Sequence, residues 1–537
     1  MEFDTIIVGA GSAGCVLADR LSADGRRNIL VLEAGPSDRR FWIHVPLGYG
    51  KTFYNPELNW AYETEPDPGL GGRSDYWPRG KVLGGSSSIN AMVYIRGHRA
   101  DYDDWAAAGN PGWGWDDVLP TFKAIEDNQA GADAWRGAGG PLHVADVSRQ
   151  IEHYCRAYIE AGKQAGLPYN PDLNGAEQEG VGYFQFTMKN SRRMSAARAF
   201  LRPAMKRANL RVETGAHVLR VLFDGKRATG VVYRQGGKEV TARAGREVIL
   251  SGGAVNSPQL LMLSGVGPAE HLRAHGIDVV HDNANVGHHL QDHLGGGFTF
   301  GVTHPTLNER LHSWPAKLLS GMQYLLTGRG PLSLSINHGG GFFRSNPDRD
   351  RPNMQLYFQA MSTLTGAHDG ERPVLNPDPF RAIGLGLSAC RPTSRGHLEL
   401  RSADPFEPPA IYPNSFGTEH DLQEMLEAMT FLRHLASQPA LAAVITEELR
   451  PGPGVASDDD MIAYIRESAG TVYHPCCTCR MGPEPAEAVV DSRLRIHGLD
   501  GLRVIDASVF PNIIAGNTNG PTMMTAAHAA GFILEET

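Results

Sequence analysis

The first 33 residues combine two short apolar runs with a glycine-rich turn. Residues 4–8 and 28–32 are rich in β-branched and aliphatic side chains, which predicts two buried parallel strands. Residues 15–21, between these runs, carry apolar side chains at helical spacing. A carboxylate, Glu33, ends the second run. The pattern therefore predicts one βαβ unit at the start of the chain.

Further apolar patterns predict elements in the second half of the chain. Residues 248–250 and 504–505 predict buried strands, and the glycine-containing stretch 251–254 is expected to turn the first of them into a helix. Apolar positions over residues 421–436 predict an amphipathic helix. Apolar and polar residues alternate over 397–401, which predicts a strand of an antiparallel sheet. Together these patterns indicate an α/β protein.

Length and composition narrow the class of protein. A chain of 537 residues exceeds one ordinary core, so at least two domains are expected. The net charge of -9 argues against a nucleic-acid partner, because phosphate binding requires a basic surface. No apolar run approaches about 20 residues, so no transmembrane helix is expected. Residues 1–4 are acidic where a signal peptide would be basic, which predicts a cytoplasmic location and leaves peripheral membrane contact open.

Six cysteines in a chain of this length do not form a disulfide framework. Three of them, Cys476, Cys477 and Cys479, cluster and raise the question of a metal site. Adjacent cysteines share a tetrahedral site poorly, and the sequence contains no second cysteine pair. We therefore expect structural thiols and no metal.

The turn of the βαβ unit, residues 9–14, reads GAGSAG, which is a dinucleotide-binding pattern. Gly9 permits a tight turn, Gly11 lets the backbone approach a pyrophosphate, and Gly14 lets helix and strand pack closely. The helix that follows directs free N–H groups and a positive dipole end at the phosphates. Glu33 is placed to accept hydrogen bonds from ribose hydroxyls. These features alone do not separate FAD from NAD.

Four later segments decide between these cofactors. They are residues 79–97 (RGKVLGGSSSINAMVYIRG), 247–261 (EVILSGGAVNSPQLL), 473–482 (YHPCCTCRMG) and 504–522, which contains VIDAS and NTNGPT. These segments occur in the same order as in the glucose–methanol–choline (GMC) oxidoreductases, and the chain resembles that family along essentially its whole length. The chain most resembles the bacterial FAD-dependent alcohol and choline dehydrogenases of that family. The resemblance implies FAD as the cofactor.

The resemblance implies which residues of this chain bind FAD. It implies that Val218 meets the adenine through its backbone, and that a helix starting near Pro521 directs its N-terminus at the flavin, where it stabilises negative charge. The FAD-binding residues implied in this way, together with those of the βαβ turn, are Gly9, Gly11, Ser12, Ala13, Gly14, Glu33, Ala34, Gly84, Ser88, Asn90, Ala91, Met92, Val93, Val218, Asp506, Ala507, Asn519, Pro521 and Thr522.

Oxidation of an alcohol by a flavin requires removal of the hydroxyl proton and transfer of a hydride to flavin N5. Among 21 histidines, His474 matches the family's active-site base, and imidazole suits proton abstraction near neutral pH. Asn517 matches the family's second catalytic position and is implied to donate to the forming alkoxide. Asn519, two residues later, is the competing assignment.

Two positions depart from the family pattern. Family members with covalently attached flavin have a histidine at the position of Ile89, so non-covalent FAD is expected here. His289 stands in the segment 286–293 where asparagine is usual, and we interpret it as structural.

The resemblance also divides the chain. Residues 1–154, 195–298 and 481–537 are expected to form a Rossmann-like FAD-binding domain assembled from discontinuous segments. Residues 155–194 and 299–480 are expected to form a substrate-binding domain. In that domain, helices flank an antiparallel sheet that roofs the flavin.

The substrate class depends on few residues. Choline dehydrogenases have glutamate where this chain has His338, which weakens a choline site, because choline requires a carboxylate or an aromatic cage. Residues 332–336 and 354–358 are mostly apolar. We therefore expect an uncharged primary alcohol, aliphatic or aromatic, that is oxidised to the aldehyde, with electrons passed to a quinone-like acceptor.

Other activities stay open on the sequence alone. They are an alcohol oxidase that uses O2, similar to aryl-alcohol or hydroxymethylfurfural oxidases, a choline dehydrogenase, and a hydroxynitrile lyase on the same fold. The intact pair of His474 and Asn517 favours oxidation over photodecarboxylation. A non-catalytic FAD-binding protein is the remaining alternative.

Overall fold

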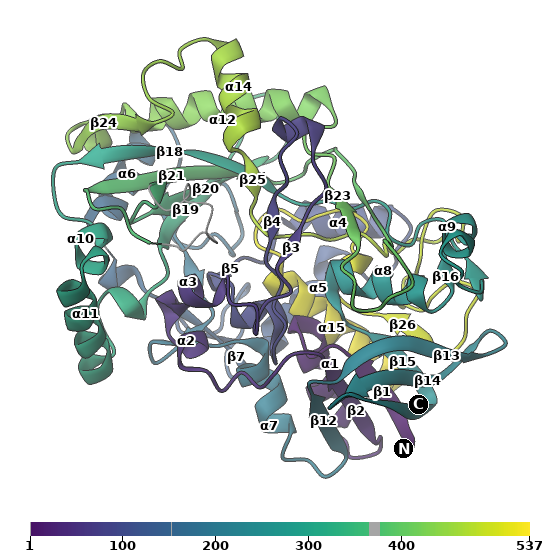
Figure 1. Ribbon diagram of the computed structural model, residues 1–537. Coiled ribbons are helices and arrows are strands. Elements are labelled where there is room, and N and C mark those ends of the chain that lie inside the picture. Colours follow the sequence, from purple (N-terminus) through teal and green to yellow (C-terminus); the bar gives the residue numbers. More distant parts are fainter. Residues whose placement is uncertain (1, 152, 365–375, 537) are drawn as a thin grey trace.

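The computed structural model describes residues 2–151, 153–364 and 376–536. Two seven-stranded sheets organise this part of the chain, and each has its own apolar core. The first sheet lies at the lower right of Figure 1 and the second at the upper left. This arrangement confirms the predicted α/β class, with a Rossmann-like sheet beside an antiparallel one.

The predicted βαβ unit lies at the centre of the first sheet. The strands in spatial order are β12 (Leu210–Thr214), β2 (Ile29–Glu33), β1 (Glu2–Val8), β15 (Lys238–Leu250), β14 (Arg227–Gln235) and β13 (His217–Asp224), and β26 (Leu502–Val504) pairs with the end of β15. β12, β2, β1, β15 and β26 run parallel, whereas β14 and β13 continue the sheet as an antiparallel meander. Every residue of β2 is buried, as expected for a strand of a covered parallel sheet.

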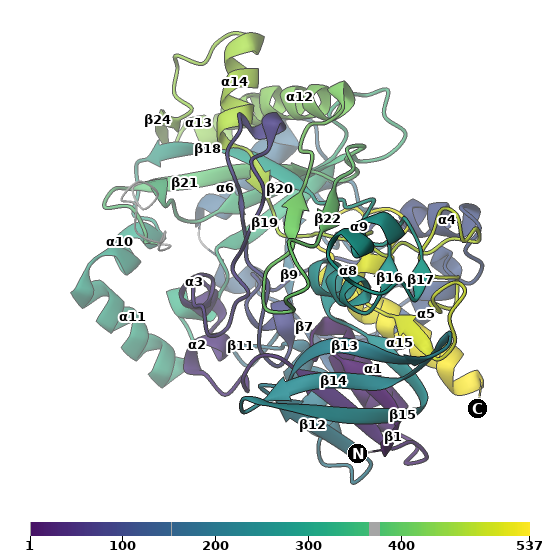
Figure 2. The same ribbon diagram turned by 45° about the vertical axis from the view of Figure 1, so that its right-hand side comes forward.

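Two helices that are distant in sequence pack side by side on this sheet (Figure 2). α1 (Ser12–Ser22) follows β1, and α15 (Asn519–Glu535) packs against it. Both helices contribute apolar side chains to the first core. α15 begins two residues before the predicted start near Pro521. A proline fits there because the N–H groups of the first helical turn have no intrahelical partner.

The second sheet is antiparallel throughout its described strands. In spatial order they are β24 (Ile445–Arg450), β18 (Leu294–Val302), β21 (Ala382–Ala389), β20 (Met354–Gln359), β19 (Asn337–Phe343) and β8 (Gly180–Tyr183), and β25 (Gly470–Thr471) pairs with β18. α12 (Glu419–Ala436), which confirms the predicted amphipathic helix, packs on β21 and β18. α6 (His153–Gln164) packs on β19 and β8.

Two expectations from the sequence need adjustment. β22 (His397–Glu399) confirms the predicted antiparallel strand, but it pairs with β23 (Ala410–Tyr412) in a separate two-stranded ribbon and does not extend the large antiparallel sheet. Leu398 is buried in a small local apolar cluster, which accounts for the alternation. β18 crosses the predicted domain boundary at residue 298 and lies wholly in the second sheet. The domain division remains a proposal, and we place this boundary before Leu294.

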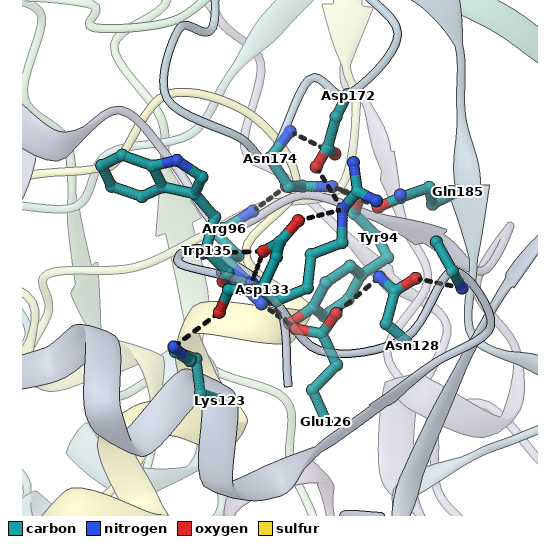
Figure 3. Close-up of polar contacts among 12 residues, drawn as sticks. Tyr94, Arg96, Lys123, Glu126, Asn128, Asp133, Trp135, Asp172, Asn174 and Gln185 are labelled. Atoms are coloured by element: carbon teal, nitrogen blue, oxygen red, sulfur yellow. Dashed lines mark hydrogen bonds and ion pairs between the residues drawn. The ribbon is translucent and has the colours of Figure 1, made fainter. Parts of the chain in front are cut away.

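A buried polar network holds the chain just after the predicted flavin-contacting stretch 84–93 (Figure 3). Arg96 forms an ion pair with Glu126, which also accepts from Tyr94 Oη at 3.2 Å. Asn174 donates to the Tyr94 carbonyl at 3.0 Å and accepts from the Arg96 amide at 2.8 Å. Because its charges are paired and hydrogen-bonded, this network is compatible with burial. It fixes the path of the chain behind residues 84–93.

Candidate active site

A cavity of about 540 Å³ is lined by residues of both sheets. Most of the residues predicted to bind FAD or substrate contribute to its wall. Those that do are Gly9, Gly11, Ser12, Ala13, Glu33, Ala34, Asn90, Ala91, Met92, Val93, Val218, His474, Asp506, Ala507, Asn517, Asn519 and Thr522. The cavity therefore brings together segments from both ends of the chain and from its middle.

The glycine-rich turn forms a tight cradle at one part of this cavity. Gly9 has a φ of +97°, and a Cβ there would lie 2.5 Å from the Ser251 carbonyl oxygen. A Cβ on Gly85 would lie 2.7 Å from the Cα of Gly11, so these two loops meet backbone to backbone. α1 begins at Ser12 with its first turn on the cavity wall. Such a cradle at a helix N-terminus fits the pyrophosphate of a dinucleotide.

Four predicted cofactor residues do not line the cavity. A Cβ on Gly14 would lie 1.9 Å from the carbonyl oxygen of the first glycine of the motif, so Gly14 serves the helix–strand contact. Gly84 has a left-handed backbone, with a φ of +90°. Ser88 Oγ donates to a backbone carbonyl of its own loop at 2.7 Å. Pro521 is buried within α15. These positions shape the site from behind its wall.

Glu33 ends β2 at the cavity wall. Its Oε2 accepts from the Ala10 amide and its Oε1 from the Gly35 amide, each at 2.9 Å. Burial raises the pKa of Glu33 to about 7, and the two N–H donors oppose this shift. The carboxylate is thus held where the family pattern expects a ribose.

Asp506 connects the end of β26 to α8 (Gly253–Leu263). Its Oδ2 accepts from the Gly253 amide at 2.8 Å and from Ser257 Oγ at 2.6 Å, and its Oδ1 accepts from the Ser508 amide at 2.8 Å. These bonds hold the segment that carries Ala507 against the N-terminus of α8. The predicted strand-to-helix turn over residues 251–254 is confirmed.

The two asparagines near the start of α15 have different partners. Asn517 Nδ2 lies 3.1 Å from His474 Nε2. Asn519 Oδ1 instead accepts from Ser12 Oγ at 2.7 Å, on the glycine-rich turn. The geometry therefore pairs Asn517 with the histidine and Asn519 with the predicted pyrophosphate cradle.

A second histidine fixes the tautomer of His474. His293 Nε2 lies 3.0 Å from the Cys390 carbonyl, which can only accept, so this nitrogen carries the proton. Burial lowers the pKa of His293 to about 4, so the ring is neutral and its Nδ1 is an acceptor. His474 Nδ1 lies 2.9 Å from that nitrogen and must donate to it. This assignment leaves His474 Nε2 unprotonated, facing Asn517.

The surroundings of His474 favour its neutral form. Burial, followed by the nearby His293 and Arg79, lowers the pKa of His474 well below its usual value. The backbone on either side of the ring is also held, since Asp292 Oδ1 accepts from the His474 amide at 2.7 Å. Arg79 Nη2 donates to the Tyr473 carbonyl at 2.7 Å. His474 is thus a fixed, neutral imidazole at the cavity wall.

The second sheet sets the orientation of Asn517. Gln355 Nε2 donates to Asn517 Oδ1 at 3.2 Å, and Tyr357 Oη donates to Gln355 Oε1 at 2.7 Å. Because an amide oxygen only accepts, the first contact turns the Asn517 NH2 group toward His474. β20 carries both supporting residues, so the second sheet orients Asn517 toward His474.

Sequence reasoning missed the groups that support this pair. Asp292 and His293 end the segment 286–293, and their signal was two adjacent ionisable residues beside an apolar run. Gln355 and Tyr357 are polar at alternate positions of an otherwise apolar strand. That period of two indicates that one face of the strand lines a site.

The backbone of His289 explains its place in the family pattern. Its φ is +64°, a conformation that asparagine adopts more readily than most non-glycine residues. Its Nε2 lies 3.0 Å from Asn285 Oδ1, and it does not belong to the cavity wall. These observations support the structural interpretation.

The three clustered cysteines are buried in the first core. The sulfur atoms of Cys476 and Cys477 lie 3.3 Å apart, and Cys477 Sγ lies 3.4 Å from Gln291 Oε1. Within the described ranges, the structure contains no group of three histidine, cysteine or acidic residues that could hold a metal ion. The three thiols pack in the first core, beneath the segment that carries His474.

Comparison with known proteins places this chain among its relatives. It matches the N-terminal and C-terminal parts of the GMC oxidoreductase family over residues 3–295 and 392–526. An alcohol dehydrogenase (acceptor) from Pseudomonas putida is 44% identical, with 99% of this chain and 96% of that protein covered. The mitochondrial choline dehydrogenase of Mus musculus is 42% identical, with 99% and 89% covered.

Solved structures show the same relationship. The crystal structure of pyridoxine 4-oxidase from Mesorbium loti superposes with a TM-score of 0.89 at 32% identity, over 99% of each chain. Formate oxidase from Aspergillus oryzae superposes with a TM-score of 0.92 at 26% identity, over 100% of this chain and 98% of that one. The cradle, the cavity and these matches agree, and the chain belongs to the GMC oxidoreductase family, as an FAD-dependent oxidoreductase.

Proposed function

We propose that this chain oxidises an uncharged primary alcohol, aliphatic or aromatic, to the aldehyde, with His474 as the base. FAD, when bound, supplies the flavin N5 that accepts the hydride. The observation that carries the proposal is the unprotonated Nε2 of His474, which His293 fixes from behind and which lies beside Asn517 on the cavity wall.

The pair offers complementary contacts to a hydroxyl group. An alcohol that enters between the two side chains can donate to His474 Nε2 and accept from Asn517 Nδ2. Proton transfer to His474 leaves a developing alkoxide, and the Asn517 N–H stabilises that charge. His474 then carries the positive charge, and its Nδ1–H remains bonded to His293. Asn517 acts chiefly as the charge increases, which is how such a donor lowers a barrier.

We propose that the FAD is bound non-covalently. Ile89 lines the cavity at the position where family members with covalent flavin have a histidine, and a hydrocarbon side chain cannot form that bond. Acid precipitation of the holoprotein should therefore leave all flavin absorbance in the supernatant. Flavin retained in the washed pellet would contradict this part of the proposal.

The charges of the cavity wall support an uncharged substrate. Two carboxylates, Glu33 and Asp506, belong to the described wall, and both accept backbone or hydroxyl hydrogen bonds beside the nucleotide cradle. The substrate-side wall includes the apolar Ile336 and Val472. Arg79 lies in the same wall, and burial lowers its pKa to about 10, so it is charged at neutral pH. A cation such as choline would meet this charge.

We propose a quinone-like electron acceptor and a cytoplasmic location. The similarity to alcohol dehydrogenase (acceptor) supports the acceptor, whereas the similarity to pyridoxine 4-oxidase supports O2 as the alternative. A panel of straight-chain alcohols, benzyl alcohol and choline should be assayed with a soluble artificial acceptor and, separately, with O2 alone. Peroxide formed at a comparable rate would identify an oxidase.

An anaerobic mixing experiment separates oxidation from a lyase reaction. Adding a good alcohol substrate without any acceptor should bleach the flavin absorbance, because the electrons stay on the cofactor. His474→Ala should retain the oxidised spectrum under the same conditions. A wild-type spectrum that stays oxidised while a cyanohydrin is cleaved would assign the chain to the lyases.

A further inference from the structure

Helix α11 (Trp314–Thr327) carries an apolar stripe on its outer surface. Along this helix, only Ser320 and Tyr324 are buried. Its exposed large apolar side chains are Trp314, Leu318, Leu319, Met322, Leu325 and Leu326, and the first and last of these are 79% and 84% exposed. Most of them recur at intervals of three and four residues, so they lie on one side of the helix. Single exposed apolar residues are ordinary, but a contiguous stripe marks an interaction site.

A second apolar element lies beside this stripe. α2 (Phe41–His44) exposes Phe41 and Trp42. Tyr324 Oη of α11 donates to the Ser191 carbonyl at 2.9 Å, and Arg193 Nε donates to the Ile43 carbonyl of α2 at 2.9 Å. The turn at residues 190–193 thus joins the two helices, which lie at the same edge of the molecule in Figures 1 and 2. We call the exposed apolar side chains of α11 and α2 the docking face.

The segments that form and adjoin the docking face are basic, although the whole chain has a net charge of -9. Three segments that meet here contain no aspartate or glutamate. They are residues 310–330 with Arg310, Lys317 and Arg329, residues 39–56 with Arg39, Arg40 and Lys51, and residues 188–198 with Lys189, Arg192, Arg193 and Arg198. Three acids flank these segments, and each forms an ion pair: Asp38 with Arg202, Glu57 with Arg40, and Glu309 with Arg381.

Arg192 and Arg198 lie close to a titratable side chain of each helix. Burial raises the pKa of Tyr324 in α11, and the charges of Arg192 and Arg198 oppose that shift. Burial lowers the pKa of His44 in α2; the charge of Asp38 opposes this shift, whereas Arg202, Arg198 and Arg192 add to it. The apolar stripe is therefore flanked by positive charge on the side toward α2.

We propose that the docking face binds the surface of a membrane that contains anionic lipids, with α11 lying in the headgroup plane. Leucine and tryptophan side chains enter the boundary of the acyl chains, while lysine and arginine contact the anionic headgroups. The attachment is peripheral, since the described helices include none with the length and apolar character needed to cross a bilayer. A second copy fits less well, because a two-fold contact would bring the same cations together.

This surface adjoins the cavity wall. α3 (Tyr49–Thr52) lies close after α2 in the chain, and Tyr49 lines the cavity. Ile336, a few residues after α11, lines it as well. Membrane binding would bring this wall near the phase in which apolar alcohols and quinones dissolve. That consequence rests on the proposed function, whereas membrane binding itself does not.

Cosedimentation of the FAD-loaded protein with vesicles tests the proposal. We expect binding to phosphatidylcholine–phosphatidylglycerol vesicles that weakens with added salt, and little binding to pure phosphatidylcholine vesicles. Leu318→Ser/Leu325→Ser/Leu326→Ser should weaken binding at least roughly tenfold. Lys317→Glu/Arg329→Glu should weaken it by a similar factor, whereas Arg220→Glu/Lys238→Glu, which changes the net charge equally on exposed positions of the first sheet, should not.

Three results would overturn the membrane assignment. The first is binding of the triple serine variant with wild-type affinity, and the second is no binding of the wild type to either vesicle. The third is a wild-type dimer in sedimentation equilibrium that the serine substitutions convert to a monomer, without vesicle binding, which would assign the face to a second copy. Turnover with a soluble artificial acceptor should persist in every variant, so loss of membrane binding is distinguishable from failure of the proposed activity.

Discussion

His293 Nδ1 lies 2.9 Å from His474 Nδ1, and this contact between two imidazoles determines which nitrogen of His474 is free. The direction of the bond follows from the Cys390 carbonyl on the far side of His293, 3.0 Å from its Nε2. A backbone carbonyl cannot donate, so His293 Nε2 carries a proton, and His474 Nδ1 carries the proton that is shared with His293 Nδ1. His293 touches neither the cavity nor a substrate and is therefore a positioning residue.

Replacing His293 should impair catalysis through the tautomer of His474. His293→Leu removes the acceptor for Nδ1–H, and we expect kcat to fall roughly 10- to 100-fold with little change in KM. His293→Gln keeps an amide oxygen that can accept, and it should recover part of the loss. Steady-state kinetics and pH profiles of both variants provide the check. Equal losses in the two variants would mean that His293 serves packing alone.

The two asparagines near the start of α15 should separate catalysis from cofactor binding. Asn517→Ala removes the donor next to His474, and kcat should fall about 100- to 1000-fold while the flavin spectrum stays normal. Asn519→Ala removes the partner of Ser12 and should chiefly weaken FAD retention. Kinetics at saturating FAD and flavin release on dilution measure the two effects. A reversal of this pattern would exchange the two assignments.

The pH dependence of kcat/KM should reflect the low pKa of His474. In the proposed mechanism its neutral form is the active base, and a lowered pKa extends the neutral form toward acid. The acid limb for a non-ionising alcohol should therefore lie below pH 6.5, the ordinary value for histidine. Activity of the FAD-saturated enzyme across a series of overlapping buffers checks this. An acid limb above pH 6.5 would contradict the described environment of the base.

Gly14 in α1 and Gly531 in α15 are both helical glycines, so Gly531→Ala serves as the control for Gly14→Ala, which affects the glycine-rich turn. A Cβ on Gly14 in α1 would lie 1.9 Å from a backbone oxygen, whereas a Cβ on Gly531 in α15 would meet nothing within 4 Å. Gly14→Ala should lose FAD and stability, because backbone must move to make room. Gly531→Ala should be neutral or stabilising by up to about 1 kcal/mol, because alanine favours helix. Thermal unfolding and bound flavin measure both outcomes.

His338 should make the stability of the protein pH-dependent. It is buried without a hydrogen-bond partner of good geometry for either ring nitrogen among the described residues, and burial lowers its pKa to about 4, opposed by the Ser335 backbone. The unfolded chain takes up this proton near pH 6.5, so folding stability falls as pH drops below that value. At pH 5, His338→Leu should avoid roughly 2 kcal/mol of the loss that the wild type suffers.

Unfolding titrations at pH 7 and pH 5 test that difference. Near pH 7 the leucine should be neutral or stabilising, since an apolar group of similar size leaves no polar atom unpaired. The same pH sensitivity in both proteins would show that other buried groups dominate.

Single helices and strands could be predicted because the repeat of apolar residues that marks each of them is visible within a few residues of sequence. β1, α1 and β2 follow that rule, and so does α12. The pairing of β22 with β23 was not predictable, because an alternating pattern reports one buried face and says nothing of which strand lies beside it. The same limit applies to β15, whose first part pairs with β14 and whose end pairs with β1 and β26.

Only those site residues that belong to a family motif could be predicted from the sequence. His474 and Asn517 came from motifs, and the structure places them 3.1 Å apart. Their supports lie far away in sequence, since 181 residues separate His293 from His474 and 162 separate Gln355 from Asn517. Contacts across such separations follow from the pairing of β18, β20 and β21 in the second sheet, and no local pattern encodes that pairing.

The pairing of β26 with β15, and of α15 with α1, has a consequence for the order of folding. The βαβ unit of β1, α1 and β2 leaves the ribosome long before residues 502–535, yet its sheet gains β26 at residues 502–504 and its helix layer gains α15 at residues 519–535. For most of synthesis, α1 therefore exposes the apolar side that α15 later covers. Contacts of such long range form slowly. The nascent chain should consequently depend on chaperones until α15 emerges, and FAD should enter only after α15 has packed on α1.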